Sequence, residues 1–330
     1  MRKERIKWID CAKGIAIVLV IVGHTPGLGE ITQGIIYSFH MPLFFILSGV
    51  TFNLSNDISE FKNNTIKSSR RLLIPAIFIF FVNSILMYKK SAFSMNSLYA
   101  FLYMSAGELN VNGIEIYGVG GTWFFFALFI GRTLFDYLHL MFNDKLKLLF
   151  FSCLCCILGI TMGQLIPLPF SADIALSIIP FFYYGMFLRN ANINESVLRK
   201  MILSLIVWLI SFFVIFPDYS KQVPINLAGR DYGFFPITYF TAFVGTMSLC
   251  YFCVILCEHK VISKPFVFIG QNSLVLFAIH SFDDKYIFPR LWVIAGHPFC
   301  SVFVRIGVDI TVLVFIMISK FYLNKLKRNS

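Results

Sequence analysis

The chain has 330 residues, of which 58% are hydrophobic and only 14% are charged. Soluble domains carry about 25% charged residues, so this composition excludes an ordinary soluble protein and is typical of a polytopic α-helical membrane protein. The net charge of +11 does not indicate a nucleic-acid partner, because the basic residues lie in short segments between apolar runs, where they orient a membrane protein.

Ten apolar runs follow one another along the chain, and we interpret each as a membrane-spanning helix. They cover residues 8–24, 34–51, 72–88, 122–140, 147–166, 173–188, 201–217, 234–257, 266–281 and 299–321. The first run lacks a small-residue cleavage site, so we expect a retained helix rather than a signal peptide. The sequence shows no soluble domain and no internal repeat, which predicts one membrane domain over residues 1–330.

Lys and Arg are distributed unevenly between the segments that join these runs. If the N-terminus is cytoplasmic, the cytoplasmic segments hold 20 Lys and Arg, whereas the outer loops hold six: Lys89, Lys90, Lys221, Arg230, Lys285 and Arg290. Cytoplasmic loops of membrane proteins carry such an excess of positive charge. We therefore predict an all-α fold of about ten transmembrane helices, with both termini in the cytoplasm.

The first run carries three ionisable residues, Asp10, Lys13 and His24. Helical spacing of about 100° per residue places them on one stripe, with His24 roughly 16 Å further along the axis than Lys13. Ionisable groups at membrane depth usually face a cavity and mark function. The alternatives are that Lys13 extends to the membrane interface with Asp10 as its ion-pair partner, and that His24 makes a structural hydrogen bond between helices.

The second run contains another histidine, His40, followed by Met41 and Pro42. Proline disfavours helical geometry in the residue before it, so we expect the backbone to break around His40 and Met41 and a helix to begin near Pro42. His24 and His40 would then lie near the outer ends of adjacent spans and could face one site. The alternative is that His40 caps a helix end.

A cationic cluster, Lys67, Arg70 and Arg71, precedes the third run. It is either ordinary positive flanking of a cytoplasmic helix end or a clamp for phosphate groups.

Four residues of later spans are further candidates for substrate binding, together with Asp10. Trp123 opens the fourth span and either lines the site or anchors the helix at the membrane interface. Asn272, Ser273 and His280 lie in the short ninth span, where His280 either faces the cavity or closes the helix against solvent.

Acidic residues of the predicted outer loops could contact sugar hydroxyls or form solvated surface: Glu108, Glu115, Asp231, Asp283 and Asp284. Cys250, Cys253 and Cys257 have helical spacing and could be read as metal ligands. We favour the other reading, in which the thiols are small apolar residues inside a helix. We expect no metal.

Five stretches are similar to a known family, and they occur in that family's order. They are WIDCAKGIAIVLVIVGH (8–24), FHMPLFFILSG (39–49), RRLLIP (70–75), GTWFFFALF (121–129) and IGQNSLVLFAIH (269–280). The chain resembles the acyltransferase-3 family of membrane O-acyltransferases, especially the branch similar to fucose 4-O-acetylases. The family pattern of Arg or Lys, ten residues and then His is met by Lys13 and His24. Many members have two arginines three apart before the third span, whereas this chain has Lys67 and Arg70, which leaves open which cation meets the donor.

The resemblance implies transfer of an acyl group, usually acetyl, from cytoplasmic acyl-CoA to a hydroxyl of a glycan or lipid-linked sugar, at the cytoplasmic (inner) membrane of a bacterium. Lys13, Lys67, Arg70 and Arg71 are the cations that match the phosphates of coenzyme A. His24, with His40, is the candidate catalytic residue, either as general base or as carrier of the acyl group. The group that orients His24 must come from another span, because Asp10 is about 21 Å away along the same helix.

Two other functions are consistent with the residues. Ionisable groups on one stripe also suit proton coupling in a secondary transporter or in a flippase for a lipid-linked sugar, although transporters commonly show internal repeats. A catalytically silent glycan-binding membrane protein is the third reading. Protein partners are not indicated.

Overall fold

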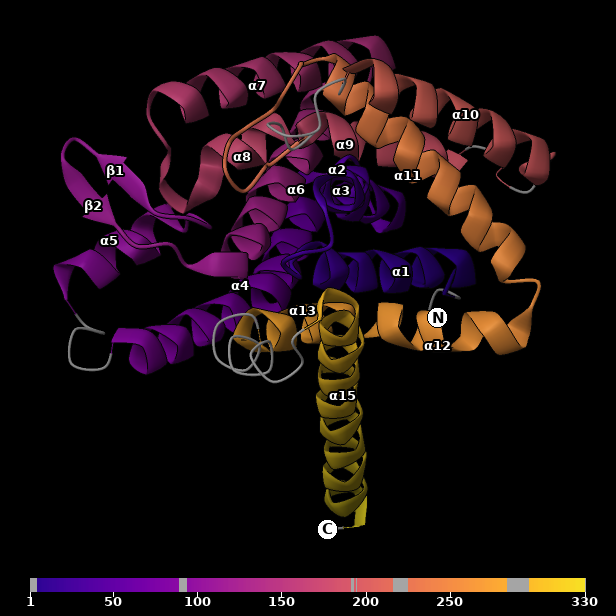
Figure 1. Cartoon of the computed structure of the whole chain (residues 1–330). Helices are drawn as coiled ribbons and strands as arrows, with labels where there is room; N and C mark the ends of the chain where they lie inside the picture. The colour runs from indigo at the N-terminus through magenta and orange to yellow at the C-terminus, as the bar shows by residue number, and fades with distance from the viewer. Residues whose placement is uncertain are drawn as a thin grey trace. The chain divides into compact units, whose positions relative to one another are not determined.

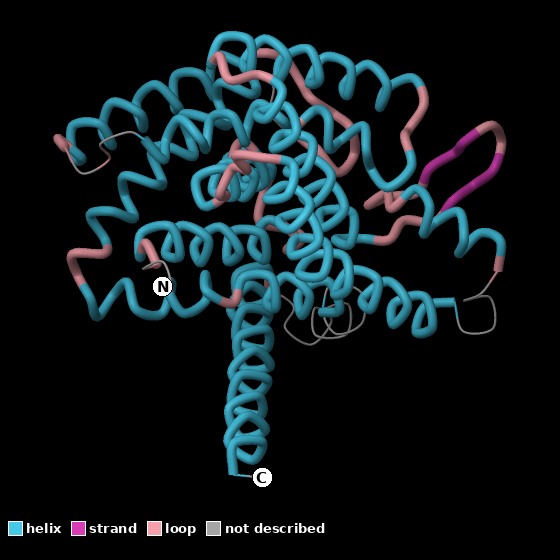
Figure 2. Tube along the Cα trace, turned by 180° about the vertical axis from the view of Figure 1, so that it is seen from behind, coloured by secondary structure: helices cyan, strands magenta, loops and turns pink. Residues whose placement is uncertain are grey.

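The computed structural model describes residues 5–88, 94–190, 193, 195–215, 225–283 and 297–329. The described chain is mostly helical (Figure 1), with one short antiparallel hairpin of β1 (Leu109–Val111) and β2 (Ile114–Ile116), drawn in magenta in Figure 2. It divides into two compact units. The terminal unit comprises Met1–Ile36 and Phe252–Ser330, and the central unit comprises Tyr37–Tyr251.

Several helices are long and apolar enough to cross a membrane. Within the described residues seven pass alone: Glu30–Thr51, Ile58–Leu86, Gly120–Met141, Lys145–Leu165, Val197–Val214, Ile237–Leu256 and Cys300–Leu323. Two bent pairs, Pro169–Ser177 with Ile179–Arg189 and Lys260–Gln271 with Ser273–Phe282, raise the number to nine if each is one span. The helical multi-pass class is therefore confirmed, while the count of ten and the side of the termini stay predictions.

The terminal unit is built on a close pair of helices that are far apart in sequence. Its elements are α1 (Lys7–Gly23), most of α2 (Glu30–Tyr37), the end of α11 (Ile237–Leu256), α12 (Lys260–Gln271), α13 (Ser273–Phe282) and α15 (Pro298–Asn329). Helices α1 and α12 lie side by side (Figures 1 and 2). A Cβ atom on Gly270 would come 1.7 Å from the carbonyl oxygen of Asp10, and one on Gly14 would come 1.9 Å from that of Phe266. Only glycine permits this backbone approach.

The predicted ninth span is broken rather than straight. Helices α12 and α13 meet at Asn272 with a bend of 70°. The Asn272 Nδ2 donates a hydrogen bond to the carbonyl oxygen of Phe268 at 2.9 Å, which satisfies one carbonyl of the last turn of α12. The bend directs α13 away from the line of α12, toward the start of α15.

The central unit contains the remaining helices. They are α3 (His40–Thr51), α4 (Ile58–Tyr88), α5 (Met95–Tyr103), the 3₁₀ turn η2 (Gly120–Thr122), α6 (Trp123–Met141), α7 (Lys145–Leu165), the 3₁₀ turn η3 (Pro169–Ser171), α8 (Ala172–Ser177), α9 (Ile179–Asn190) and α10 (Val197–Ile215). Helices α3 and α9 approach almost as closely as α1 and α12 do, since a Cβ on Gly185 would meet the carbonyl oxygen of Ile46 at 2.1 Å. Phe45 packs against Phe124 and Phe182 in the core beside this crossing.

The central unit also contains a buried ion pair of Asp173 and Arg230. The guanidinium of Arg230 donates to both carboxylate oxygens of Asp173, at 2.5 and 3.3 Å, and to the hydroxyl of Ser105 at 3.1 Å. Arg230 is thus a buried structural residue. Asp284 and the other five cations predicted in outer loops, Lys89, Lys90, Lys221, Lys285 and Arg290, lie outside the described residues.

The helix break in the second predicted span lies earlier than expected. Helix α2 ends at Tyr37 and α3 begins at His40, so the break falls on Ser38 and Phe39 rather than on His40 and Met41. Pro42 is therefore inside the first turn of α3, where proline is tolerated because its missing N–H would have no helical partner.

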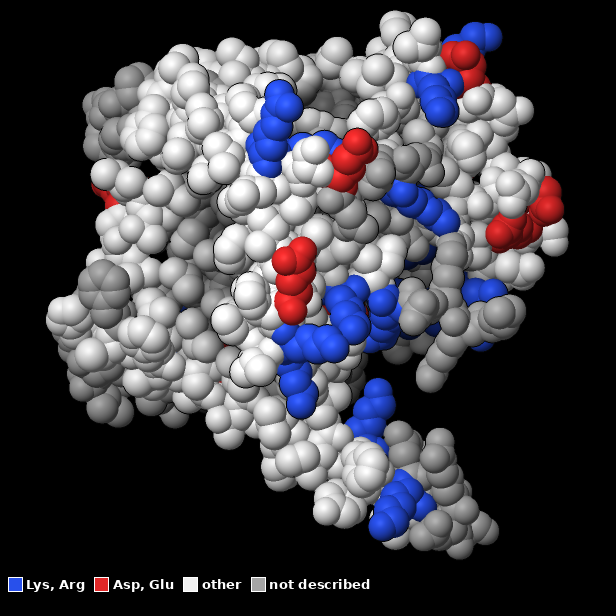
Figure 3. Space-filling model, turned by 90° about the vertical axis from the view of Figure 1, so that its right-hand side faces the viewer, with Lys and Arg blue, Asp and Glu red and all other residues white. Residues whose placement is uncertain are grey.

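Large apolar side chains are exposed over much of the surface. Helix α7 alone exposes Phe150, Leu154, Ile157, Leu158 and Leu165. On the face in Figure 3 uncharged residues dominate, and the Lys and Arg side chains gather in a few groups. A soluble protein exposes few such apolar patches, so these surfaces fit contact with lipid.

Candidate active site

His24 is held at the end of α1 by hydrogen bonds of its backbone. It is the C-terminal cap of that helix, and its N–H donates to the carbonyl oxygen of Val20 at 3.0 Å. Its carbonyl oxygen accepts a hydrogen bond from the Nη1 of Arg305 at 3.0 Å. The side chain is exposed. A histidine on a fixed backbone with an accessible ring can meet a substrate.

The ring of His24 contacts a second histidine, and that histidine contacts a carboxylate. The Nδ1 of His24 lies 3.1 Å from the Nε2 of His280, and the Nδ1 of His280 lies 3.2 Å from the Oδ2 of Asp309. His280 is in the last turn of α13 and Asp309 is in α15, and both are buried. We call His24, His280 and Asp309 the histidine chain. It runs from an exposed ring to a fully buried carboxylate.

A buried ion pair borders the histidine chain. The Nε of Arg305 donates to the Oδ2 of Asp283 at 2.6 Å, and both side chains are fully buried. The same oxygen of Asp283 lies 3.7 Å from the Nδ1 of His280. Arg305 thus bonds both to Asp283 and to the backbone of His24. It ties α15 to the end of α1.

Three of these groups have the geometry of metal ligands. His280, Asp283 and Asp309 each offer a ligand atom, and these atoms lie within 4.8 Å of one another. However, the guanidinium of Arg305 already bonds to Asp283 and supplies positive charge there. A metal ion at this point would face that charge, so the arrangement fits a hydrogen-bonded chain better than a cation site.

Asp10 and Lys13 belong to the same helix as His24, further toward its start. Both are half-buried, and the Oδ2 of Asp10 is buried with no hydrogen-bond partner among the described residues. Asp10 and Lys13 thus lie within α1, and His24 is its C-terminal cap. The structure adds that its end at His24 connects to α13 and α15.

Asn272 and Ser273 lie at the bend between α12 and α13, and both are half-buried. The bend places them at the start of the helix whose last turn carries His280. Their predicted role in substrate binding stays a prediction.

The other predicted site residues belong to the central unit. His40 is the first residue of α3 and is buried, with its ring edge-on to Tyr37 at 4.8 Å between centroids. Trp123 opens α6 and is buried against Phe124. Because His24 and His40 belong to different units, their predicted pairing stays a prediction.

The cationic cluster lies inside a long helix, not at its start. Lys67, Arg70 and Arg71 are exposed on α4, which begins nine residues before Lys67, at Ile58. The charge of Arg71 acts on Arg132 of α6. Arg132 is thus a further cation near the cluster, on a second helix.

Sequence reasoning missed most of the buried partners of His24. Arg305 and Asp309 interrupt the last apolar run at positions four apart, and an intramembrane ionisable residue is by itself a reason to expect a site. The sequence predicts Asp283 in an outer loop, in contact with sugar or solvent, but it is fully buried. The sequence predicts His280 as a site residue but indicates neither His24 nor Asp309 as its neighbour. The spacing of Arg305 and Asp309 was the signal that could have led to them.

One comparison with known proteins is informative. A family model described as an acyltransferase domain, that of the acyltransferase-3 family, matches residues 6–323. No curated protein and no solved structure matches the chain. The family match includes both compact units and every residue of the histidine chain.

Proposed function

Because the chain belongs to the acyltransferase-3 family, we propose that it is a membrane O-acetyltransferase of the fucose 4-O-acetylase-like branch. It transfers an acyl group, in the first instance acetyl, from cytoplasmic acyl-CoA to a hydroxyl of a cell-envelope or exported glycan. The observation that carries this proposal is the histidine chain, in which the exposed ring of His24 is backed by buried His280 and Asp309.

The membrane topology we propose has ten spans, with both termini on the cytoplasmic side of a bacterial inner membrane. Helix α1 supplies the tenth span; its 17 residues measure about 26 Å along the axis, close to the thickness of the hydrocarbon core. The distribution of Lys and Arg supports this orientation. Cysteine-accessibility labelling should find residue 329 cytoplasmic and residue 112 external; labelling of both from the same side would overturn it.

The histidine chain accounts for a base at His24. A neutral His280 that donates its Nδ1–H to Asp309 presents a lone pair at Nε2, which accepts the Nδ1–H of His24. The Nε2 of His24 then carries the lone pair of a neutral imidazole. That nitrogen is suited to accept the proton of a sugar hydroxyl, since histidine titrates near neutral pH.

The reaction can be written with these groups. The acceptor hydroxyl gives its proton to the Nε2 of His24 while its oxygen attacks the thioester carbonyl. The new C–O bond forms and the C–S bond breaks. The coenzyme A thiolate that leaves is then protonated by the His24 imidazolium. Asp309 stabilises the transient positive charge through His280. A two-step route, in which His24 carries the acyl group, uses the same chain.

We assign the cations described above to the donor and the polar and aromatic groups to the acceptor. Lys67, Arg70 and Arg71 hold phosphates of the donor, and Lys13 meets it from α1, so that Lys13 and His24 serve the two ends of one cavity. His40 is the second residue that we propose for catalysis. The acceptor is bound by polar and aromatic groups: Asp10, Trp123, Asn272, Ser273 and His280. No metal takes part.

The test is acetyl transfer by the purified protein in lipid nanodiscs. Release of free coenzyme A from acetyl-CoA, with a panel of candidate sugars, should occur for the native chain. It should fall by about 10²–10⁴-fold in His24→Ala, because a positioned base contributes that factor. Mass spectrometry of envelope glycans with and without the gene identifies the acceptor.

Controls separate this function from transport. His24→Ala should keep the thermal stability of the native protein and still bind acyl-CoA. Near-normal turnover in a folded His24→Ala variant would make the histidine structural. Movement of a lipid-linked sugar across the bilayer without release of coenzyme A would favour the transporter.

A further inference from the structure

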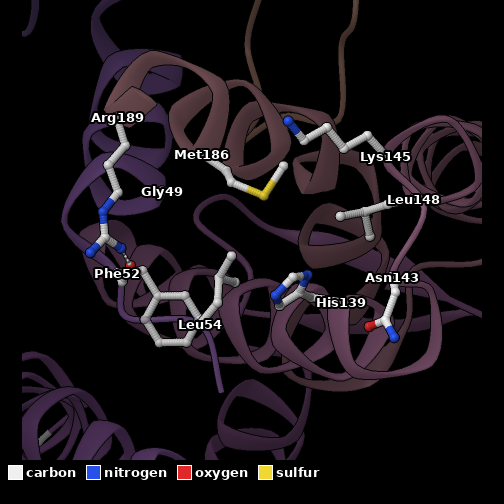
Figure 4. A pocket seen from close by; sticks show the side chains of 9 residues that line it. All are labelled: Gly49, Phe52, Leu54, His139, Asn143, Lys145, Leu148, Met186 and Arg189. Atoms are coloured by element: carbon white, nitrogen blue, oxygen red, sulfur yellow. Dashed lines mark hydrogen bonds between the residues drawn. The ribbon is translucent and has the colours of Figure 1, made fainter. Parts of the chain in front are cut away.

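The central unit contains a cavity that none of the proposed catalytic residues lines. It is partly open, has a volume of about 350 Å³ and lies where α3, α6, α7 and α9 end or begin (Figure 4). Its polar side chains are His139 and Asn143 from the end of α6 and beyond, Lys145 at the start of α7, and Arg189 on α9. Its walls include the apolar side chains of Leu54, Leu148 and Met186, so the cavity combines a cationic rim with an apolar wall.

The charge of this cavity is positive. Of the described residues that line it, two are permanent cations and none is Asp or Glu. Asp144, which precedes Lys145 in the sequence, is outside the lining, and its side chain accepts the backbone N–H of Lys147 at 2.8 Å. The cavity is therefore suited to an anion.

Two features prepare the cavity for a ligand. Arg189 is fixed in place, because its Nη1 donates to the carbonyl oxygen of Phe52 at 2.6 Å, as the dashed line in Figure 4 marks. The Nδ1 of His139 is buried and has no hydrogen-bond partner among the described residues. A buried ring nitrogen without a partner is costly unless a ligand or water supplies one.

A series of neighbouring residues leads from the cavity to Arg71 of the cationic cluster on α4. The Phe52 whose carbonyl bonds to Arg189 also has the Arg132 guanidinium over its ring, 3.9 Å from the centroid. Arg71 lies near enough to Arg132 for the two positive charges to repel each other. Lys145 and Arg189 also belong to segments that the charge distribution assigns to the cytoplasm. The anion would therefore come from the cytoplasm, at the same end of the central unit as the cluster.

Resting on the proposed function, we infer that this cavity binds the nucleoside end of the acyl-CoA donor, with the ribose phosphate between Lys145 and Arg189 and the adenine against the apolar wall. Coenzyme A carries phosphate at two places, the pyrophosphate and the ribose. The exposed cluster Lys67, Arg70 and Arg71 suits the pyrophosphate, which joins the ribose to the extended pantetheine arm. The walled cavity suits the phosphate beside the base. Lys and Arg both bind phosphate strongly through charge-assisted hydrogen bonds.

The test is equilibrium binding of coenzyme A to the protein in nanodiscs of neutral lipid. Lys145→Gln should weaken binding by about 10- to 100-fold, the loss expected for one charge-assisted contact. The same change should weaken the binding of dephospho-coenzyme A much less, because that molecule lacks the ribose phosphate. The matched control is Lys147→Gln, two residues further on α7, exposed and outside the cavity lining. It should leave both affinities unchanged.

A second variant and a second donor separate this inference from the proposed function. Arg189→Gln, with its thermal stability measured, should reproduce the Lys145→Gln pattern. Transfer from acetyl-pantetheine, which has no nucleotide, should be unaffected by Lys145→Gln and still require His24. Equal affinities of Lys145→Gln, Lys147→Gln and native protein for coenzyme A would overturn the cavity assignment without touching the role of His24.

The shared phosphate chemistry could instead come from a lipid headgroup. If adenosine bisphosphate fails to compete with coenzyme A, and if anionic lipid in the nanodisc stabilises native protein but not Lys145→Gln, the cavity is a lipid site and the inference is wrong.

Discussion

Both compact units contain a buried ion pair of Asp and Arg, but the two pairs have different neighbours. Asp283 and Arg305 in the terminal unit contact His280 and the backbone of His24. Among the described residues, Asp173 and Arg230 in the central unit bond to each other, to the hydroxyl of Ser105 and to the backbone N–H of Leu168, and to no histidine.

This difference indicates which pair belongs to a reaction. A buried ion pair contributes little net stability compared with apolar packing, yet removal of one partner leaves an unpaired buried charge. Either pair can therefore hold helices together. Only the one beside His280 can influence the proton affinity of a histidine that reaches an exposed ring. The comparison predicts a chemical defect when the terminal unit is altered and a folding defect when the central unit is altered.

The largest effect is expected for Asp309→Asn. This change keeps the shape of the side chain but removes the charge that stabilises protonated His24 through His280. Turnover should fall by about 10²–10⁴-fold at saturating donor and acceptor, the range for loss of general-base function. Coenzyme A release by protein with native thermal stability is the measurement. A folded variant with turnover within a few-fold of native would remove Asp309 from the mechanism.

Asp173→Ala should instead destabilise the protein. The change leaves the buried guanidinium of Arg230 without its carboxylate partner, which should lower the free energy of unfolding by about 3–5 kcal/mol. Denaturation in detergent micelles should show the loss, while turnover per folded molecule stays native. Asp173→Ala combined with Arg230→Leu should recover part of the stability, because no charge is then left unpaired. Native stability of the single variant would mean that the pair does not hold the central unit together.

Arg70→Gln tests the donor side of the central unit. Loss of one charge-assisted contact should raise the apparent KM for acetyl-CoA by an amount equivalent to about 1.5–3 kcal/mol, with little change in that for the sugar. Lys62→Gln, exposed on the same helix, is the matched control. If both variants have the native donor KM, the cluster serves only to orient the helix in the membrane.

The smallest effect is expected for Gly307→Ala in α15. An added Cβ would meet nothing within 4 Å, so the variant should be more stable by about 0.5–1 kcal/mol through the better helix propensity of alanine. Gly270→Ala should act in the opposite direction, because its Cβ would collide with the backbone of α1. Thermal unfolding of the two variants provides the comparison. Equal stabilities would contradict the close approach of α1 and α12.

Much of the architecture could be predicted from the sequence, because lipid imposes simple rules on composition. Apolar runs of the right length must be helices, since the backbone has no other hydrogen-bond partners in a bilayer. The multi-pass helical class, the acyltransferase-3 family and the position of His24 at the end of a first helix followed from residues that are local in the chain. The bends at Ile178 and Asn272 did not, because hydropathy averages over a helix and is insensitive to its direction.

The sequence by itself determined the helical membrane class, the family and the candidate residues Lys13 and His24, because each depends on spacing within one segment. Only the tertiary structure decided which residues contact His24 and form the histidine chain. His280 is 256 positions away along the chain, and the two rings meet because Gly14 and Gly270 let α1 and α12 pack backbone against backbone. The bend after α12 and the contact of α13 with α15 then bring Asp309 to His280. No periodicity within a single helix encodes such a meeting, because it depends on packing between segments at opposite ends of the chain.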